Sequence, residues 1–505
     1  MATYHSTRSR TSELSSKQAI RRGIAPDGGL YVSDALGETT IDLTSLASKD
    51  YFELAREVLG ALLPDYSTDE IAACVSEAYE GTFASDEVTP VVPLAQAPNA
   101  DGVSSYVLEL WHGPTSAFKD VALQMLPRLM ARAKDGDGKG GSTRTMVVTA
   151  TSGDTGKAAL AGFADAPGCG IAVFYPAGKV SDVQRLQMVT QAGENVAVCA
   201  VRGNFDDAQT AVKRTFGDAE LSERLAGNGI VLSSANSINV GRLVPQVAYY
   251  FAAYAQLLRA GAVSEGDKVE FCVPTGNFGD VLAGYYASLL GLPVARLDVA
   301  SNANNVLTDF LSTGVYDRDR PFHTTISPSM DILVSSNLER ALYYLSGGDC
   351  ELVSRLMADL TEKGRYQVPA DLLERLRSVF ACGYATDDEA RAAIARSWEK
   401  DGVLLDPHSA CGRHVMDLLP RAEGAAARVL LCTASPYKFP AAVCRALGLY
   451  APPSGFACMR ILERHTGTTA PEQLSALESA QARFSDEIDP DRIPAYVEDA
   501  ANRLF

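Results

Sequence analysis

The sequence predicts an α/β fold in which parallel sheets are covered by crossover helices. Short apolar runs, such as TMVVTA at 145–150 and KVEFCVP at 268–274, lack the alternation of a half-exposed strand. Such runs are typical of strands buried on both faces, and each is followed by a glycine-bearing loop and a helical pattern. Parallel sheets of this kind bind ligands at the carboxyl ends of their strands, which is where these loops are expected.

Length, composition and charge narrow the class of protein. The chain has 505 residues, which is more than one hydrophobic core usually serves, so two or three packed units are expected. Apolar residues make up 47% and charged residues 21%, as in folded globular proteins. Lys and Arg number 45 against 62 Asp and Glu, and the net charge of −17 argues against nucleic acid or an anionic membrane as a general partner. An anionic ligand must therefore be held locally, by backbone amides and a few cations.

The cysteines and the first residues bear on location. The ten cysteines are scattered, mostly within apolar runs, and none has CxxC spacing. This predicts reduced core cysteines rather than a disulfide or metal framework. The opening MATYHSTRSRTSEL lacks the apolar centre of a signal peptide, and no stretch is long and apolar enough to span a bilayer. We expect a cytoplasmic enzyme or binding protein without a metal site.

Two regions differ from the sheet pattern. The first ninety or so residues carry helical periodicity in YFELAREVLGALL and DEIAACVSEAYE, which predicts an α-rich entry unit. Residues 301–400 are richer in charge and helical periodicity, which predicts a largely helical insertion. The strand-like RVLLCTA at 428–434 then returns the chain to the sheet.

A lysine in an unusual setting is the first candidate for chemistry. Lys119 lies within HGPTSAFKDVALQ, at the predicted start of a helix that Thr115 or Ser116 could cap. The positive end of a helix disfavours an ammonium, and partial burial adds to that cost. Both effects lower the lysine pKa and favour the free amine that imine chemistry with a carbonyl requires. For a lone lysine, however, an ordinary solvated position is the commoner explanation.

Three polar loops are candidates for anion binding. PTGNFG at 274–279 has two glycines before a helix predicted at 280–290, so its amides and the helix dipole favour a phosphate. It lacks the lysine and hydroxyl of a Walker A loop, which disfavours a nucleoside triphosphatase. TSGDTG at 151–156 and SANSINVGR at 234–242 suit a carboxylate or a phosphate ester. Taken singly, each loop is equally compatible with a helix cap or a tight turn.

Taken together and in this order, the motifs resemble fold-type II pyridoxal-phosphate enzymes of the tryptophan synthase β-like kind, and within them the longer bacterial and fungal threonine synthases. The resemblance covers nearly the whole chain and rests on DGGLYV, HGPTSAFKD, ATSGDTG, SSANSINVGR, PTGNFGD, SPSMDILVSSNLER, DPHSACG and TASPYKF. It implies an N-terminal unit at 1–95, a small α/β domain at 141–234, and a large cofactor-binding domain at 96–140 and 235–505.

The resemblance also implies roles for individual residues. Lys119 resembles the catalytic lysine that forms a Schiff base with the cofactor and then carries protons. Thr433 resembles the residue that hydrogen-bonds the pyridine nitrogen, where a neutral hydroxyl moderates the electron withdrawal of the ring. The remaining matches are the phosphate cradle Gly276, Asn277, Phe278 and Gly279; Ser152, Asp154 and Thr155, which meet the substrate carboxylate and the phenolic oxygen; and the substrate-phosphate clamp Asn236, Ser237, Asn239 and Arg242.

The chain departs from the family pattern at one position. Ser435 occupies a histidine position of the TAHPAKF form, so a proton-transfer role there is not carried over. His408, beside a proline turn, is expected to be structural. His112 is closer to Lys119 in the sequence and is a candidate for shaping the pocket.

The implied reaction converts O-phospho-L-homoserine and water to L-threonine and phosphate, by γ-elimination followed by β-addition of water, the last step of threonine biosynthesis. Alternatives remain: a phospho-lyase that releases 2-oxobutanoate, a serine or threonine dehydratase, and a non-catalytic protein that binds the cofactor or a metabolite. A monomer is the expected state.

Overall fold

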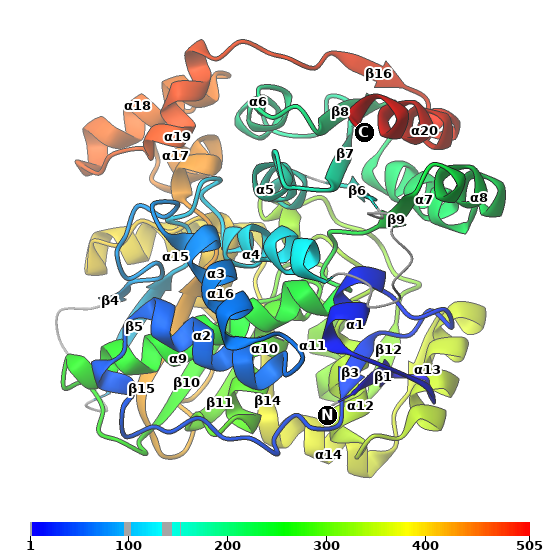
Figure 1. The fold of residues 1–505 in the computed structure, drawn as a ribbon. Coiled ribbons are helices and arrows are strands. Elements are labelled where there is room, and N and C mark those ends of the chain that lie inside the picture. Colours follow the sequence, from blue (N-terminus) through cyan, green and yellow to red (C-terminus); the bar gives the residue numbers. More distant parts are fainter. Residues whose placement is uncertain (1–2, 95–102, 134–143, 152) are drawn as a thin grey trace.

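The computed structural model describes residues 3–94, 103–133, 144–151 and 153–505 (Figure 1). Two separate sheets with parallel strands dominate it, as the sequence predicts. The larger has the order β14-β11-β10-β15-β5-β4, and every neighbouring pair is parallel except β4 with β5. Its strands are β4 (Val91–Pro93), β5 (Ser104–Glu109), β10 (Lys268–Pro274), β11 (Val294–Ser301), β14 (Phe380–Tyr384) and β15 (Ala425–Cys432).

The smaller sheet has the order β16-β8-β7-β6-β9 and is wholly parallel. Every residue of β7 and β8 is buried, which confirms the expectation drawn from the apolar runs. The strand pairings join residues 486–488 to this sheet, whereas the sequence placed all of 235–505 with the larger one; the domain boundaries themselves stay a prediction. The strands are β6 (Arg144–Ala150), β7 (Cys169–Pro176), β8 (Val196–Val201), β9 (Ile230–Ser233) and β16 (Asp486–Ile488).

Helices cover both sheets and connect their strands (Figure 1). Those associated with the smaller sheet are α5 (Asp154–Phe163), α6 (Asp182–Val189), α7 (Phe205–Gly217), α8 (Ala219–Gly227) and α20 (Ile493–Leu504). Those associated with the larger sheet are α4 (Lys119–Arg132), α9 (Val240–Arg259), α10 (Gly279–Leu289), α16 (Pro407–Leu418), α17 (Pro440–Ala446), α18 (Gly455–Thr466) and α19 (Glu472–Ser475). In the described part of the chain, no helix is long and apolar enough to cross a bilayer.

The N-terminal unit is helical, as predicted, but it also contains a three-stranded antiparallel sheet of order β2-β1-β3. The strands are short and were not evident from periodicity. The DGG turn is tightly packed, since a Cβ on Gly29 would lie 2.1 Å from Ser6 Oγ. The elements are β1 (Tyr4–Ser6), β2 (Ser9–Leu14), α1 (Ser16–Arg22), β3 (Tyr31–Ser33), α2 (Tyr51–Leu62) and α3 (Thr68–Tyr79).

The region at 301–400 is mostly helical, but it also supplies the edge strand β14 of the larger sheet. Among the described residues, β14 pairs with β11 alone. The helical periodicity of the region did not predict this strand. The other elements here are α11 (Val306–Thr313), β12 (Val315–Asp317), α12 (Leu338–Leu345), α13 (Cys350–Lys363), β13 (Arg365–Gln367), α14 (Ala370–Val379) and α15 (Asp387–Asp401).

Candidate active site

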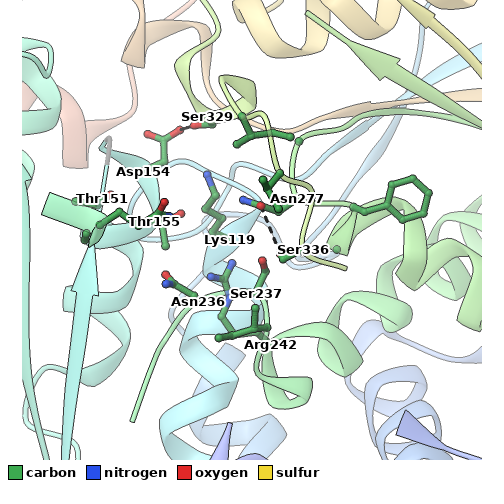
Figure 2. A pocket seen from close by; sticks show the side chains of 18 of the residues that line it. Lys119, Thr151, Asp154, Thr155, Asn236, Ser237, Arg242, Asn277, Ser329 and Ser336 are labelled. Atoms are coloured by element: carbon green, nitrogen blue, oxygen red, sulfur yellow. Dashed lines mark hydrogen bonds between the residues drawn. The ribbon is translucent and has the colours of Figure 1, made fainter. Parts of the chain in front are cut away.

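A cavity of about 990 Å³ lies where the loops after the strands of both sheets face each other (Figure 2). The predicted residues that line it are Lys119, Asp154, Thr155, Asn236, Ser237, Arg242, Gly276, Asn277, Phe278, Gly279 and Thr433. Asn239 does not line it, and Ser152 lies outside the described residues. Loops that are far apart in the sequence therefore meet around one space.

Lys119 is the first residue of α4, but the predicted cap is wrong. The cap position is Phe118, without a side-chain hydrogen bond. Thr115 instead binds the carboxylate of Asp120, with its N–H 2.9 Å from Oδ2 and its Oγ1 2.6 Å from Oδ1. Asp120 reaches back because Gly113 leaves the room: a Cβ there would lie 2.5 Å from Asp120 Cβ. Asp120, the residue after Lys119, thus fixes the turn that precedes Lys119.

The Lys119 side chain is 8% exposed and projects toward the cavity (Figure 2). Burial lowers its pKa to about 8; the nearby carboxylate of Asp154 opposes this, and the cations of Arg242 and Lys438 add to it. This confirms the direction predicted from the sequence. Near neutral pH, a useful fraction of Lys119 is therefore the neutral amine.

The loop Gly276–Gly279 leads from β10 into α10. Phe278 has a left-handed backbone (φ 62°), and its ring packs edge-on against Phe380, so it presents its backbone to the cavity. Within the described residues, the N–H groups of Gly276, Asn277 and Phe278 have no acceptor. A Cβ on Gly276 would lie 3.1 Å from Ser329 O, which explains the glycine. Free amides before a helix are suited to a phosphate.

The loop after β6 carries Asp154 at the start of α5. Thr151 Oγ1 accepts from the N–H of Gly153 and of Gly156, each at 2.9 Å. Gly153 has φ 142°, and a Cβ there would lie 2.4 Å from Gln184 Nε2. Only glycine fits this position without displacing Gln184, and the resulting turn points Asp154 into the cavity (Figure 2).

Asp154 is held by groups that the sequence analysis did not assign. Lys438 Nζ lies 2.8 Å from Asp154 Oδ1, and both side chains are buried. Ser329 Oγ donates to Oδ2 at 3.0 Å and Gln184 Nε2 to Oδ1 at 3.1 Å. Burial alone would raise the pKa of Asp154, but Lys438 and Lys119 hold it well below its ordinary value. Lys438 and Ser329 both lie in quoted motifs, yet nothing local indicated that they face Asp154.

The predicted clamp is partly assembled. Arg242 is 3% exposed; one Nη donates to Ala235 O at 2.8 Å, while Nε has no partner within the described residues. Burial lowers the Arg242 pKa to about 10. Asn236 and Ser237 lie beside it (Figure 2). Asn239 was expected in the clamp but does not face the cavity. It is fully buried, caps α9 by accepting from Gly241 N–H, and donates to Ile20 O at 2.9 Å.

A second buried carboxyl, Asp280, lines the cavity at the start of α10. The hydroxyls of Tyr249 and Tyr250 donate to its Oδ1, the latter at 3.2 Å. Burial nevertheless raises the Asp280 pKa to about 7. No motif reasoning had indicated this group.

The residues near Thr433 have distinct environments. The Thr433 hydroxyl makes no hydrogen bond within the described residues, so it is available to a ligand, and its carbonyl accepts from Phe118 N–H at 2.8 Å. His408 lines the cavity but is engaged on both sides, by Asp406 Oδ1 at 2.7 Å and Ser329 N–H at 3.1 Å. Ser435 is fully buried and caps a short turn. His112 binds Glu109 and does not line the cavity.

Family models match almost the entire chain. Residues 84–434 match the model described as "Pyridoxal-phosphate dependent enzyme". Residues 3–79 match "Threonine synthase N terminus", and residues 409–497 match "Threonine synthase, C-terminal". The chain belongs to the threonine synthase family. It is therefore a pyridoxal-phosphate-dependent enzyme of fold-type II, and the family predicted from the ordered motifs is confirmed.

Individual relatives are similar over most of the chain. Threonine synthase of Pseudomonas aeruginosa is 39% identical over 443 residues, which cover 87% of this chain and 89% of that protein. Human threonine synthase-like 1 is 37% identical over 85% of this chain, but the match spans only 58% of that protein's length. The structure of PLP-bound threonine synthase from Brucella melitensis superposes with a TM-score of 0.86 at 37% identity, covering 99% of this chain and all of that one.

The residues around the cavity fit pyridoxal phosphate. A buried amine with a lowered pKa faces the cavity, the amides before α10 lack acceptors within the described residues, and a threonine hydroxyl is unused. These features match the aldehyde, the phosphate and the ring nitrogen of the cofactor in turn.

Proposed function

We propose that this family member converts O-phospho-L-homoserine and water to L-threonine and phosphate. The observation that carries the proposal is that two separate sets of donors, unused among the described residues, line one cavity: the N–H groups of residues 276–278 and Nε of the Arg242 guanidinium. One suits the phosphate of the cofactor and the other suits a phosphate on the substrate. A dehydratase whose substrate lacks phosphate has no need of the second site.

Each side chain is proposed to have a definite role. Lys119 attaches the cofactor covalently and, once released, moves protons on the substrate. Gly276–Gly279 hold the cofactor phosphate through backbone N–H groups, and Thr433 faces the ring nitrogen. Arg242 binds the substrate phosphate; Asn236 and Ser237 complete that clamp, while Thr155 and the loop at 151–156 receive the substrate carboxylate.

The proton steps follow from the pKa of Lys119. When bound, pyridoxal phosphate supplies an electron sink that acidifies C–H bonds of the substrate. Neutral Lys119 takes the proton from Cα, passes it to solvent and, as a free amine again, takes one from Cβ. The Cγ–O bond breaks, the leaving phosphate takes up the proton released from Cα, and protonated Lys119 gives its proton to Cγ. Water adds its hydroxyl to Cβ and a proton returns to Cα, so that threonine and phosphate account for all atoms.

The charged neighbours of Lys119 act on its pKa in opposite directions. Asp154 stays ionised beside it because Lys438 pairs with Asp154. Lys438 and Arg242 disfavour the ammonium form of Lys119. The site thus holds a lysine that is partly the neutral base near neutral pH.

The test is to mix the purified holoenzyme with O-phospho-L-homoserine, measure released phosphate, and identify the carbon product by chromatography. Threonine formed in step with phosphate supports the proposal. Phosphate with 2-oxobutanoate would replace it with a phospho-lyase activity, and no phosphate release would refute the proposed substrate.

We further propose a cytoplasmic monomer. The ten cysteines are unpaired, as is usual in a reducing compartment. Light scattering of the eluting holoenzyme would give the mass; a dimer mass would refute the monomer.

A further inference from the structure

Arg340, in α12, is a buried cation that does not line the cavity. It is 0% exposed. Its Nε donates to Tyr31 O at 3.0 Å, one Nη donates to Ile238 O at 2.7 Å, and the other donates to Asn337 Oδ1. No carboxylate of the described residues forms an ion pair with it. Burying a charge among neutral partners costs stability, which suggests that Arg340 has a functional role.

The contacts of Asn337 indicate that role. Its side-chain amide donates to Ser237 O and to Asn277 O, each at 3.1 Å. Its backbone N–H also donates to Asn277 O, at 3.0 Å. Ser237 belongs to the clamp loop at 236–238, and Asn277 belongs to the cradle at 276–279. One amide therefore bridges the two loops from behind the cavity.

Arg340 joins this bridge to a third part of the chain. Through Ile238 it contacts the clamp loop directly, through Asn337 it orients the bridging amide, and through Tyr31 it reaches β3 of the N-terminal unit. The planar fork of a guanidinium suits three acceptors at fixed angles, which an ammonium cannot match. Its positive charge also lies behind two loops suited to anions.

Resting on the proposed function, we propose that Arg340 is a positioning residue that fixes the clamp loop and the cradle relative to each other. The contact of Arg340 with Tyr31 O holds these loops against the N-terminal unit. The distance between the two phosphates is then set by residues that touch neither phosphate. Arg340 also offsets the negative charge that accumulates when both sites are filled.

Three variants test this inference. Arg340→Met removes the charge and the fork, and Arg340→Lys keeps the charge alone. Asn337→Asp keeps size but replaces the bridging donor with an acceptor. Arg8→Met is the matched control, because it breaks the 2.8 Å pair between Arg8 and Glu339, which also joins α12 to the N-terminal unit but leaves both loops untouched.

The measurements are the Kd of inorganic phosphate for the apoprotein, the Kd of pyridoxal phosphate, kcat and KM separately, and the melting temperature. Losing hydrogen bonds to a charged group should weaken both Kd values on the order of tenfold in Arg340→Met and Asn337→Asp. KM should rise more than kcat falls, and Arg340→Lys should recover only part of the loss. Arg8→Met should lower the melting temperature alone.

The inference is overturned if Arg340→Met and Asn337→Asp lower the melting temperature, as Arg8→Met does, and leave both Kd values within about twofold of the parent. If Arg340→Met does not fold, Asn337→Asp and Arg340→Lys report the same constants. Phosphate binding by the apoprotein does not depend on the identity of the substrate, so a chain that binds phosphate but makes no threonine would contradict the proposed function and not this inference.

Discussion

Replacing Lys119 with methionine should stabilise the apoprotein while abolishing catalysis. Burial moves the pKa of Lys119 from the ordinary 10.5 to about 8. One pKa unit corresponds to about 1.4 kcal/mol, so keeping this lysine protonated costs roughly 3 kcal/mol at pH 7. Methionine has a similar length and no charge, and Asp154 keeps its partner Lys438 in the variant. The folded state should therefore gain up to that amount.

The stability gain of Lys119→Met should depend on pH in a definite direction. The folded pKa lies below the unfolded one, so between pH 8 and 10.5 the unfolded chain binds more protons and the parent becomes more stable as pH rises. The penalty is fully present below pH 8 and disappears toward pH 10.5. The advantage of Lys119→Met should thus shrink by roughly 2 kcal/mol between pH 8 and about pH 9.5.

The assay is urea unfolding of the apoproteins across this range, with Lys400→Met, on the exposed face of α15, as the control for losing one lysine. A gain that does not vary with pH, or a variant less stable than the parent at pH 7, would refute the reasoning. The first outcome would mean that the gain is ordinary packing. The second would mean that Lys119 is not penalised by burial.

Other substitutions give separate outcomes. Lys438→Met removes a cation that lowers the Lys119 pKa; the rate of cofactor attachment to the apoprotein, followed by absorbance, should have its midpoint at higher pH, and an unmoved midpoint would contradict this. Arg242→Met should raise KM on the order of 100-fold with cofactor affinity nearly unchanged, because one partner of a buried charged contact is lost. If cofactor affinity fell as much as KM rose, Arg242 would bind the cofactor phosphate and not the substrate phosphate. Gly153→Ala should cost about 1–3 kcal/mol and reduce activity, since φ is 142° and its Cβ would displace Gln184 from Asp154; urea unfolding and kcat check both.

Sequence patterns predicted the features that depend on residues close together in the chain. The buried strands, the direction of the Lys119 pKa and the loop before α10 all follow from the residues beside them. Lys438 and Ser329 were missed because their partner, Asp154, is remote in the chain: Ser329 lies 175 residues away. Asn239 was misassigned because a side chain in a polar loop can cap the helix instead of facing the cavity. The prediction that Thr115 caps α4 was wrong for a similar reason, since the Thr115 hydroxyl donates to the Asp120 carboxylate instead.

The pairing of β16 with β8 has a consequence for how the chain is made. Arg202, just after β8, pairs with Glu487 of β16 across 285 residues of sequence. After β16 in the chain, α20 places Ile493 and Val497 in the core of the smaller sheet. During synthesis, the edge of β8 therefore remains open while most of the larger sheet is being produced. Closing so long a loop is slow, and an open edge strand invites pairing with other chains. The smaller sheet, whose strand β6 leads to Asp154, is thus expected to need protection from pairing with other chains until β16 has been made.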